Sequence, residues 1–114
     1  MKLNNKILPG ALCEIKLGNL IITADGFATV GGQLTNKMLV YEKIDLFSYP
    51  SSNDFRGKSS SVKDGDIVII LKYIGRPEKV IKDPVWFQYD IYEVLLPCGH
   101  KRQMFKQNLF KVQR

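Results

Sequence analysis

The sequence is poor in the residues that build metal and catalytic centres, with one histidine and two cysteines among 114 residues. Cys13 and Cys98 lie far apart in the chain, and the Cys-x-x-Cys spacing typical of zinc sites does not occur. Two cysteines are also too few for a disulfide-dense secreted scaffold. We therefore expect two free thiols, Cys13 in a buried strand and Cys98 in a turn, with a bridge between them as the open alternative.

Long apolar runs and a sustained helical period are missing as well. No stretch approaches the roughly 18 apolar residues that suggest a membrane helix, so we expect no membrane partner. Near the N-terminus, Pro9-Gly10 interrupts the apolar residues 7–13, which makes this segment a poor signal peptide.

Positive charge is present and is gathered near the C-terminus. The net charge is +6, and residues 98–114 contribute +5 because they hold five cations and no acidic residue. We take four of these cations as a candidate basic patch: Lys101, Arg102, Lys106 and Lys111. Such a patch suits nucleic acid or an acidic protein surface. The alternative is that these cations only keep an edge strand soluble.

Short alternating or β-branched stretches separated by turn residues predict an all-β fold. Residues 11–17 alternate between apolar and polar, as in a half-buried strand, and Asp25-Gly26 predicts a hairpin. Residues 67–74 form a β-branched, apolar run in which Lys72 is the one charged residue, and this run predicts the most buried strand. Residues 51–61 are rich in Ser, Asn, Asp and Gly, and predict a surface loop.

The stretch from residue 89 to residue 112 predicts the closing half of a small barrel. Tyr92, Val94 and Leu96 share one face of a strand, and Pro97-Cys98-Gly99 forms the turn that follows. Residues 100–105 return as a second strand. Residues 106–109 are too short for an α-helix and fit a 3₁₀ turn before a final strand.

Several segments match the pattern of a known family in order. Residues 44–51 read Ile-Asp-Leu-Phe-Ser-Tyr-Pro-Ser, residues 62–70 contain Lys-Asp-Gly-Asp before a strand, and residues 92–99 read Tyr-Glu-Val-Leu-Leu-Pro-Cys-Gly. Together with Leu109 after the 3₁₀ turn, this order resembles a bacterial SH3-like domain, and the layout is similar to small SH3-like proteins of tailed phages.

The resemblance covers about residues 43–112. It implies a small SH3-like barrel over residues 43–114, with residues 1–42 as an N-terminal strand and hairpin that pack on the barrel or extend its sheet. The chain departs from the family where Arg102-Gln103-Met104 replaces the usual Gly-Trp-Val. For this reason the resemblance does not imply recognition of cell-wall peptides.

Aromatic residues near strand ends and in loops, together with one arginine, are candidates for binding a protein partner. These candidates are Phe47, Tyr49, Phe55, Arg76, Trp86, Phe87 and Tyr89. The alternative is that Trp86 and Phe87 only cap the barrel.

Chemistry at Cys98 and His100 is the remaining hypothesis. Two residues apart on a strand they could share a face and form a nucleophile–base pair, but an exposed turn does not exclude water. A zinc site from Cys13, Cys98, His100 and a carboxylate lacks the expected spacing. We therefore expect no enzyme activity, no cofactor and no metal.

The sequence and the resemblance together favour a non-enzymatic protein-binding module, an accessory or structural component of a phage or bacterial assembly. We expect it in a virion or in the cytoplasm, meaning the host cytoplasm if a phage encodes it. One alternative is a nucleic-acid-binding module that uses the basic C-terminal hairpin. A further alternative is a phage inhibitor of a host factor.

Overall fold

The computed structural model describes residues 7–17, 21–23, 26–28, 37–44, 55–76 and 90–112, and within these ranges nearly all regular structure is β. The predicted all-β fold is confirmed. The elements are β1 (Leu12–Ile15), β2 (Ile21–Thr23), β3 (Gly26–Ala28), β4 (Lys37–Ile44), β5 (Phe55–Lys63), β6 (Ile67–Gly75), β7 (Ile91–Leu95), β8 (Lys101–Phe105), the 3₁₀ turn η3 (Lys106–Asn108) and β9 (Leu109–Lys111).

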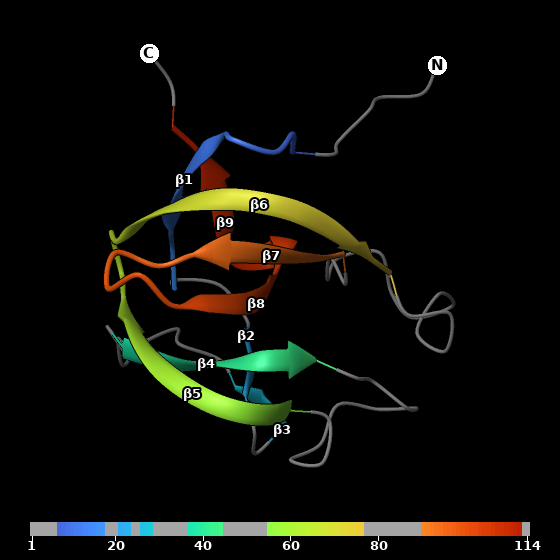
Figure 1. Ribbon diagram of the computed structural model, residues 1–114. Helices are drawn as coiled ribbons and strands as arrows, with labels where there is room; N and C mark the ends of the chain where they lie inside the picture. The colour runs from blue at the N-terminus through green and yellow to red at the C-terminus, as the bar shows by residue number, and fades with distance from the viewer. Residues whose placement is uncertain are drawn as a thin grey trace, which may run out of the picture.

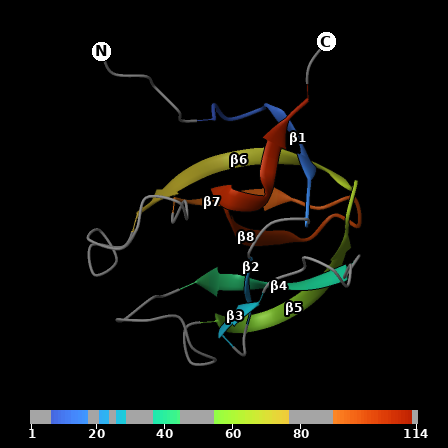
Figure 2. The ribbon, with the colours of Figure 1, turned by 180° about the vertical axis from the view of Figure 1, so that it is seen from behind.

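Seven strands form one antiparallel sheet in the order β5-β4-β8-β7-β6-β1-β9. β5 and β6 are not neighbours in this order, yet the chain passes from one to the other through the Asp64-Gly65 turn. Gly65 has φ +94°, a left-handed conformation that favours glycine. The sheet therefore curls into a half-barrel, with β6 and β1 on one side and β4 and β5 on the other (Figures 1 and 2).

The N-terminal strand β1 extends the barrel sheet, because it pairs with β6 on one side and with β9 on the other. It also holds the β5–β6 turn: the Gly65 N–H donates to the Ile15 carbonyl at 2.7 Å, and an Asp64 carboxylate oxygen accepts from the Leu17 N–H at 2.7 Å. β4 runs without a break from Lys37 to Ile44, so a domain boundary between residues 42 and 43 would divide this strand.

The predicted hairpin is present as a separate two-stranded sheet of β2 and β3, but its turn does not include Gly26 as predicted. Thr23 pairs with Gly26, so Gly26 is the first residue of the return strand. Residues 24 and 25, which connect the two strands, lie outside the described residues.

The core lies on the concave side of the curled sheet. Its buried side chains come from most of the strands: Cys13, Ile15, Leu17, Val40, Val62, Val68, Ile70, Tyr92, Val94, Leu96, Met104 and Leu109, with Ile7 from the segment before β1. The faces predicted for residues 11–17 and 92–96 are thus confirmed. The Tyr92 hydroxyl accepts the Ile7 N–H at 2.9 Å, which ties the N-terminal segment to β7.

The C-terminal half follows the predicted order of strand, turn, strand, 3₁₀ turn and strand. The Leu96 N–H donates to the His100 carbonyl at 2.9 Å, and the Gly99 N–H donates to the Leu96 carbonyl at 2.8 Å. These two bonds close the β7–β8 turn. The last strand, β9, begins at Leu109, one residue before the predicted start at Phe110.

Two predictions about strands are wrong. Residues 55–61 belong to β5, not to a loop: β4 supplies their main-chain partners, and their polar composition reflects an exposed edge strand. β6 is not the most buried strand, since Ile67, Ile69 and Ile74 are 43, 37 and 40% exposed. An antiparallel sheet can leave one face in solvent, and an apolar run in the sequence does not reveal this.

Candidate binding surfaces

The aromatic candidates divide between two parts of the chain. Phe47, Tyr49, Trp86, Phe87 and Tyr89 lie outside the described residues. Arg76 follows β6 and is half-buried, and Phe55 begins β5, also half-buried. The structure places the Phe55 ring 5.5 Å from the ring of Tyr41, centroid to centroid, at an interplanar angle of 45°. Sequence reasoning did not select Tyr41.

The four cations of the predicted basic patch have different environments. Lys101 and Lys111 are exposed, but on β8 and β9, which β7, β6 and β1 separate in the sheet. Lys106 is half-buried, and this burial lowers the pKa of its ammonium group, an effect that Asp90 opposes. Arg102 is only 5% exposed and so does not belong to an exposed patch, contrary to the prediction. It points inward because it alternates with Lys101 and Gln103 on β8.

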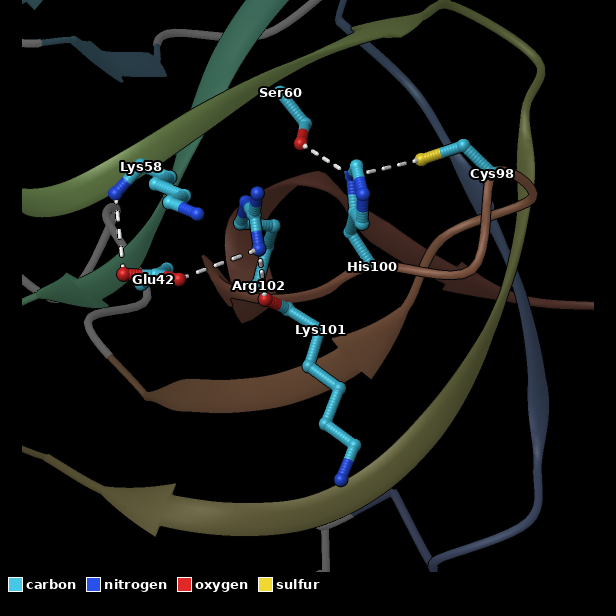
Figure 3. A network of polar contacts seen from close by, with 7 residues as sticks. All are labelled: Glu42, Lys58, Ser60, Cys98, His100, Lys101 and Arg102. Carbon is cyan, nitrogen blue, oxygen red and sulfur yellow. Dashed lines mark hydrogen bonds and ion pairs between the residues drawn. The ribbon is translucent and has the colours of Figure 1, made fainter.

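Inside the curl, Arg102 faces Glu42 on the neighbouring strand. Its Nη1 donates to the Lys101 carbonyl at 2.7 Å and lies 4.0 Å from Glu42 Oε2, while its Nε has no hydrogen-bond partner among the described residues (Figure 3). The other Glu42 oxygen accepts the Lys58 N–H at 3.1 Å. Glu42 therefore joins the β5 backbone to the buried cation.

The Glu42 carboxylate is positioned by a bulge in β5. The register shifts between Tyr41 and Lys43, so that two β5 residues, Gly57 and Lys58, lie opposite Glu42 alone. Gly57 has φ +86°, and a Cβ at this position would lie 2.8 Å from the Glu42 Cβ. Glycine is thus required there both by its conformation and by the close approach of Glu42.

Cys98 and His100 do share a face, as the sequence suggested. Cys98 Sγ lies 3.5 Å and Ser60 Oγ 3.3 Å from His100 Nδ1 (Figure 3). Both Cys98 and His100 are exposed at the turn, so the geometry gives a hydrogen-bonded surface group and not a water-excluding site. Cys13 is fully buried, and burial raises the pKa of its thiol, an effect that Lys111 opposes. Both thiols are free.

Within the described ranges no three His, Cys, Asp or Glu side chains come together in an arrangement that could hold a metal ion. Nor do these ranges include a helix with the length and apolar character needed to cross a membrane.

A basic surface missed by sequence reasoning lies on the outer side of β4 and β5, and we call it the β4–β5 face. The register places Lys37 opposite Lys63 and Lys43 opposite Arg56, so that like charges face each other at both ends. Between these pairs lie Leu39, Tyr41, Ser59 and Ser61. The sequence signal for the β4 half of this face is the alternation Lys37-x-Leu39-x-Tyr41-x-Lys43. The β5 half could not be found in the same way, because residues 51–61 were predicted to be a loop.

A shallow pocket adjoins this face where β4 and β8 separate. The two strands share one register pair, Tyr41 with Gln103, and the Gln103 Oε1 accepts the Ile44 N–H at 2.7 Å in place of a further main-chain bond. The pocket has room for about one water molecule. Its lining is mainly apolar and includes Tyr41, Phe55 and Gln103.

A second surface, which we call the apolar face, spans the outer side of β7, β6, β1 and β9. Its members are Leu12, Ile67, Ile69, Leu95 and Phe110. Ile69 lies opposite both Leu12 and Leu95, while Ile67 and Phe110 flank Glu14 on neighbouring strands. Ile67, Ile69 and Phe110 are each about 40% exposed (43, 37 and 39%).

Comparison with known proteins finds no family model that matches the chain, and no curated protein or solved structure matches it. The function has therefore to be inferred from these surfaces.

Proposed function

We propose that the protein is a non-enzymatic protein-binding module, an accessory or structural component of a larger assembly, that docks its partner on the apolar face. The observation that carries this proposal is the continuity of large apolar side chains across four neighbouring strands. Single exposed apolar residues are normal on a protein surface, whereas a contiguous patch is typical of an interaction site.

A partner that covers this face would gain an appreciable hydrophobic contribution to its binding free energy. Fully burying a large aliphatic or aromatic side chain is worth about 1.5–3 kcal/mol, so covering one that is about 40% exposed is worth about 1 kcal/mol. Ile67, Ile69 and Phe110 together would contribute about 3 kcal/mol. This is a substantial part of the binding free energy of a micromolar complex, which is about 8 kcal/mol.

The charges around the apolar face indicate the kind of partner. Lys16, Lys72 and Lys101 lie on or beside the outer side of these strands, with Glu14 and Glu93 among them. Lys72 is directly opposite Glu93, so these two offset each other and the remaining rim is positive. We propose a protein partner with an apolar strip and an acidic border.

The SH3-like resemblance of residues 43–112 supports a binding role, since such barrels serve as scaffolds for surface sites. The location in a virion or in the cytoplasm belongs to the same proposal. A phage inhibitor of a host factor would be a special case, in which the partner is a host protein.

The test compares Ile69→Asp with Ile74→Asp. Both positions are on β6 and similarly exposed, at 37 and 40%, but they are about 17 Å apart along the strand. Affinity capture from a lysate of the native source, quantified by mass spectrometry, should recover a partner with wild type and with Ile74→Asp, and lose it with Ile69→Asp. If no protein depends on Ile69 in this way while both variants remain folded by circular dichroism, the apolar face is not the docking surface.

A further inference from the structure

The β4–β5 face carries charge that the fold itself does not explain. Lys37 and Lys63 are directly opposite each other, and like charges in this arrangement are destabilising. Within the described ranges neither lysine forms an ion pair with a carboxylate. The second like-charge pair, Lys43 and Arg56, lies six residues farther along β4, about 20 Å away.

Protection of a sheet edge does not account for these lysines. Lysine on an edge strand prevents sheets from joining, and β5 is such an edge. Lys37 and Lys43, however, are on β4, which is paired with β5 on one side and with β8 on the other. Because β5 covers β4 along its length, these two lysines do not protect the outer edge of the sheet.

Tyr41 lies between the charged ends of this face, and Phe55 lies just beyond one of them, opposite Ile44. Tyr41 is half-buried, its β5 neighbour is the small Ser59, and its ring contacts that of Phe55. Leu39 beside it is 53% exposed, opposite the equally small Ser61. Because the serines leave these side chains uncovered, the face offers an aromatic and apolar platform flanked by cations.

We propose that the β4–β5 face binds single-stranded nucleic acid. Bases stack on aromatic side chains while nearby cations hold the phosphates, and the β4–β5 face combines these two features.

This site is independent of the proposed docking surface. The apolar face lies over β6, β1 and β9, whereas β4 and β5 form the opposite side of the curled sheet (Figures 1 and 2). A protein partner and a nucleic-acid strand can therefore be bound together, and variants on one face should leave binding at the other unchanged.

The first experiment measures binding of a fluorescent oligothymidylate of about 12 nucleotides by anisotropy, within the site sizes of about 4–16 nucleotides known for small barrels. Phosphate contacts from the three lysines of this face predict, on a single strand, a slope of log K against log salt of about −2.1, or about 20-fold weaker binding between 50 and 200 mM salt. Lys37→Glu combined with Lys43→Glu should abolish most of this binding. Absence of measurable binding by wild type at the lower salt would overturn the proposal.

The matched control is Lys111→Glu, which makes the same kind of charge change on an exposed residue of β9, at the other edge of the sheet. We expect it to weaken oligonucleotide binding by less than twofold, whereas the single variant Lys37→Glu should weaken it at least tenfold. Equal losses from both variants would place the nucleic acid at the basic C-terminus or on no defined site, and so contradict the β4–β5 assignment.

A third arm separates nucleic acid from other polyanions. Replacing an aromatic that stacks on a base costs about 1–3 kcal/mol, which corresponds to at least about fivefold in affinity. Tyr41→Leu and Phe55→Leu should therefore weaken oligothymidylate binding at least about fivefold and leave binding of inorganic polyphosphate unchanged. If both ligands respond only to the lysine variants, the face recognises an acidic polymer or an acidic protein, and the nucleic-acid proposal is wrong.

Discussion

Replacing Lys63 by glutamate should make the protein more stable, although most surface substitutions have little effect. In the native protein the Lys63 side chain lies directly opposite Lys37 on the exposed outer side of β4 and β5. Lys63→Glu turns this like-charge pair into an opposite-charge pair at the same register position. The change therefore removes a repulsion and adds an attraction.

The size of the gain follows from the exposure of both residues. A cross-strand charge pair contributes about 0.2–1 kcal/mol, and exposed ion pairs are at the lower end because solvent screens them. Adding the lost repulsion to the new attraction gives about 0.5 kcal/mol in the free energy of unfolding. For a chain of this length that corresponds to a rise of about 2 °C in Tm.

The assay is thermal and urea unfolding followed by circular dichroism, at low salt and again at 1 M salt. We expect the gain at low salt and its loss at 1 M, where the Debye length falls to about 3 Å. Lys111→Glu is the control, since it makes the same charge change opposite the uncharged Cys13. The reasoning is refuted if Lys63→Glu is no more stable than wild type at low salt, or if Lys111→Glu gains as much. A stabilised variant that binds oligonucleotide poorly would show that this charge is kept for binding at the expense of stability.

Three further predictions test the fold. In urea unfolding, Gly65→Ala should lower the free energy of unfolding by about 1 kcal/mol, because alanine is strained in a left-handed conformation. Gly57→Ala should lower it clearly more, because its Cβ would also lie 2.8 Å from a side-chain carbon on β4. A thiol reagent should label Cys98 at once and Cys13 only after unfolding, as seen by mass spectrometry; equal labelling would contradict the burial of Cys13. Burial and the hydrogen bond to a neighbouring carboxylate raise the pKa of Tyr73 from 10.0 to about 12. The contribution of this shift to stability should therefore be intact below pH 10 and lost as the pH rises toward 12. In alkaline unfolding, the Tyr73→Phe variant should lose less stability over this range than wild type.

Alternation of apolar and polar residues is enough to predict the strands whose inner face is fully buried. The face of Tyr92, Val94 and Leu96 can be read directly from the sequence. Side chains of a strand alternate between its two faces, so when only one face is buried the apolar residues show which one it is. Residues 55–61 offer no such signal. Most of their side chains are exposed on an edge strand, and their main-chain pairing with β4 decides the structure.

The candidate surfaces were harder to predict because they depend on register. Lys37 and Lys63 are 26 residues apart in the sequence, and they meet only because the β4–β5 pairing places them opposite each other. Arg102 was wrongly predicted to be exposed because it is next to other cations in the sequence. A charged residue next to other cations suggests a surface patch, yet its inward position on β8 is set by the alternation that also buries Met104.

The central claim, that a protein partner docks on the apolar face, is tested most directly by methyl NMR of the protein titrated with the partner that affinity capture identifies. The methyl signals of Ile67 and Ile69 should shift or broaden, and those of Leu39 on the opposite side of the barrel should stay in place. Perturbation of Leu39 with unchanged signals from Ile67 and Ile69 would contradict the claim.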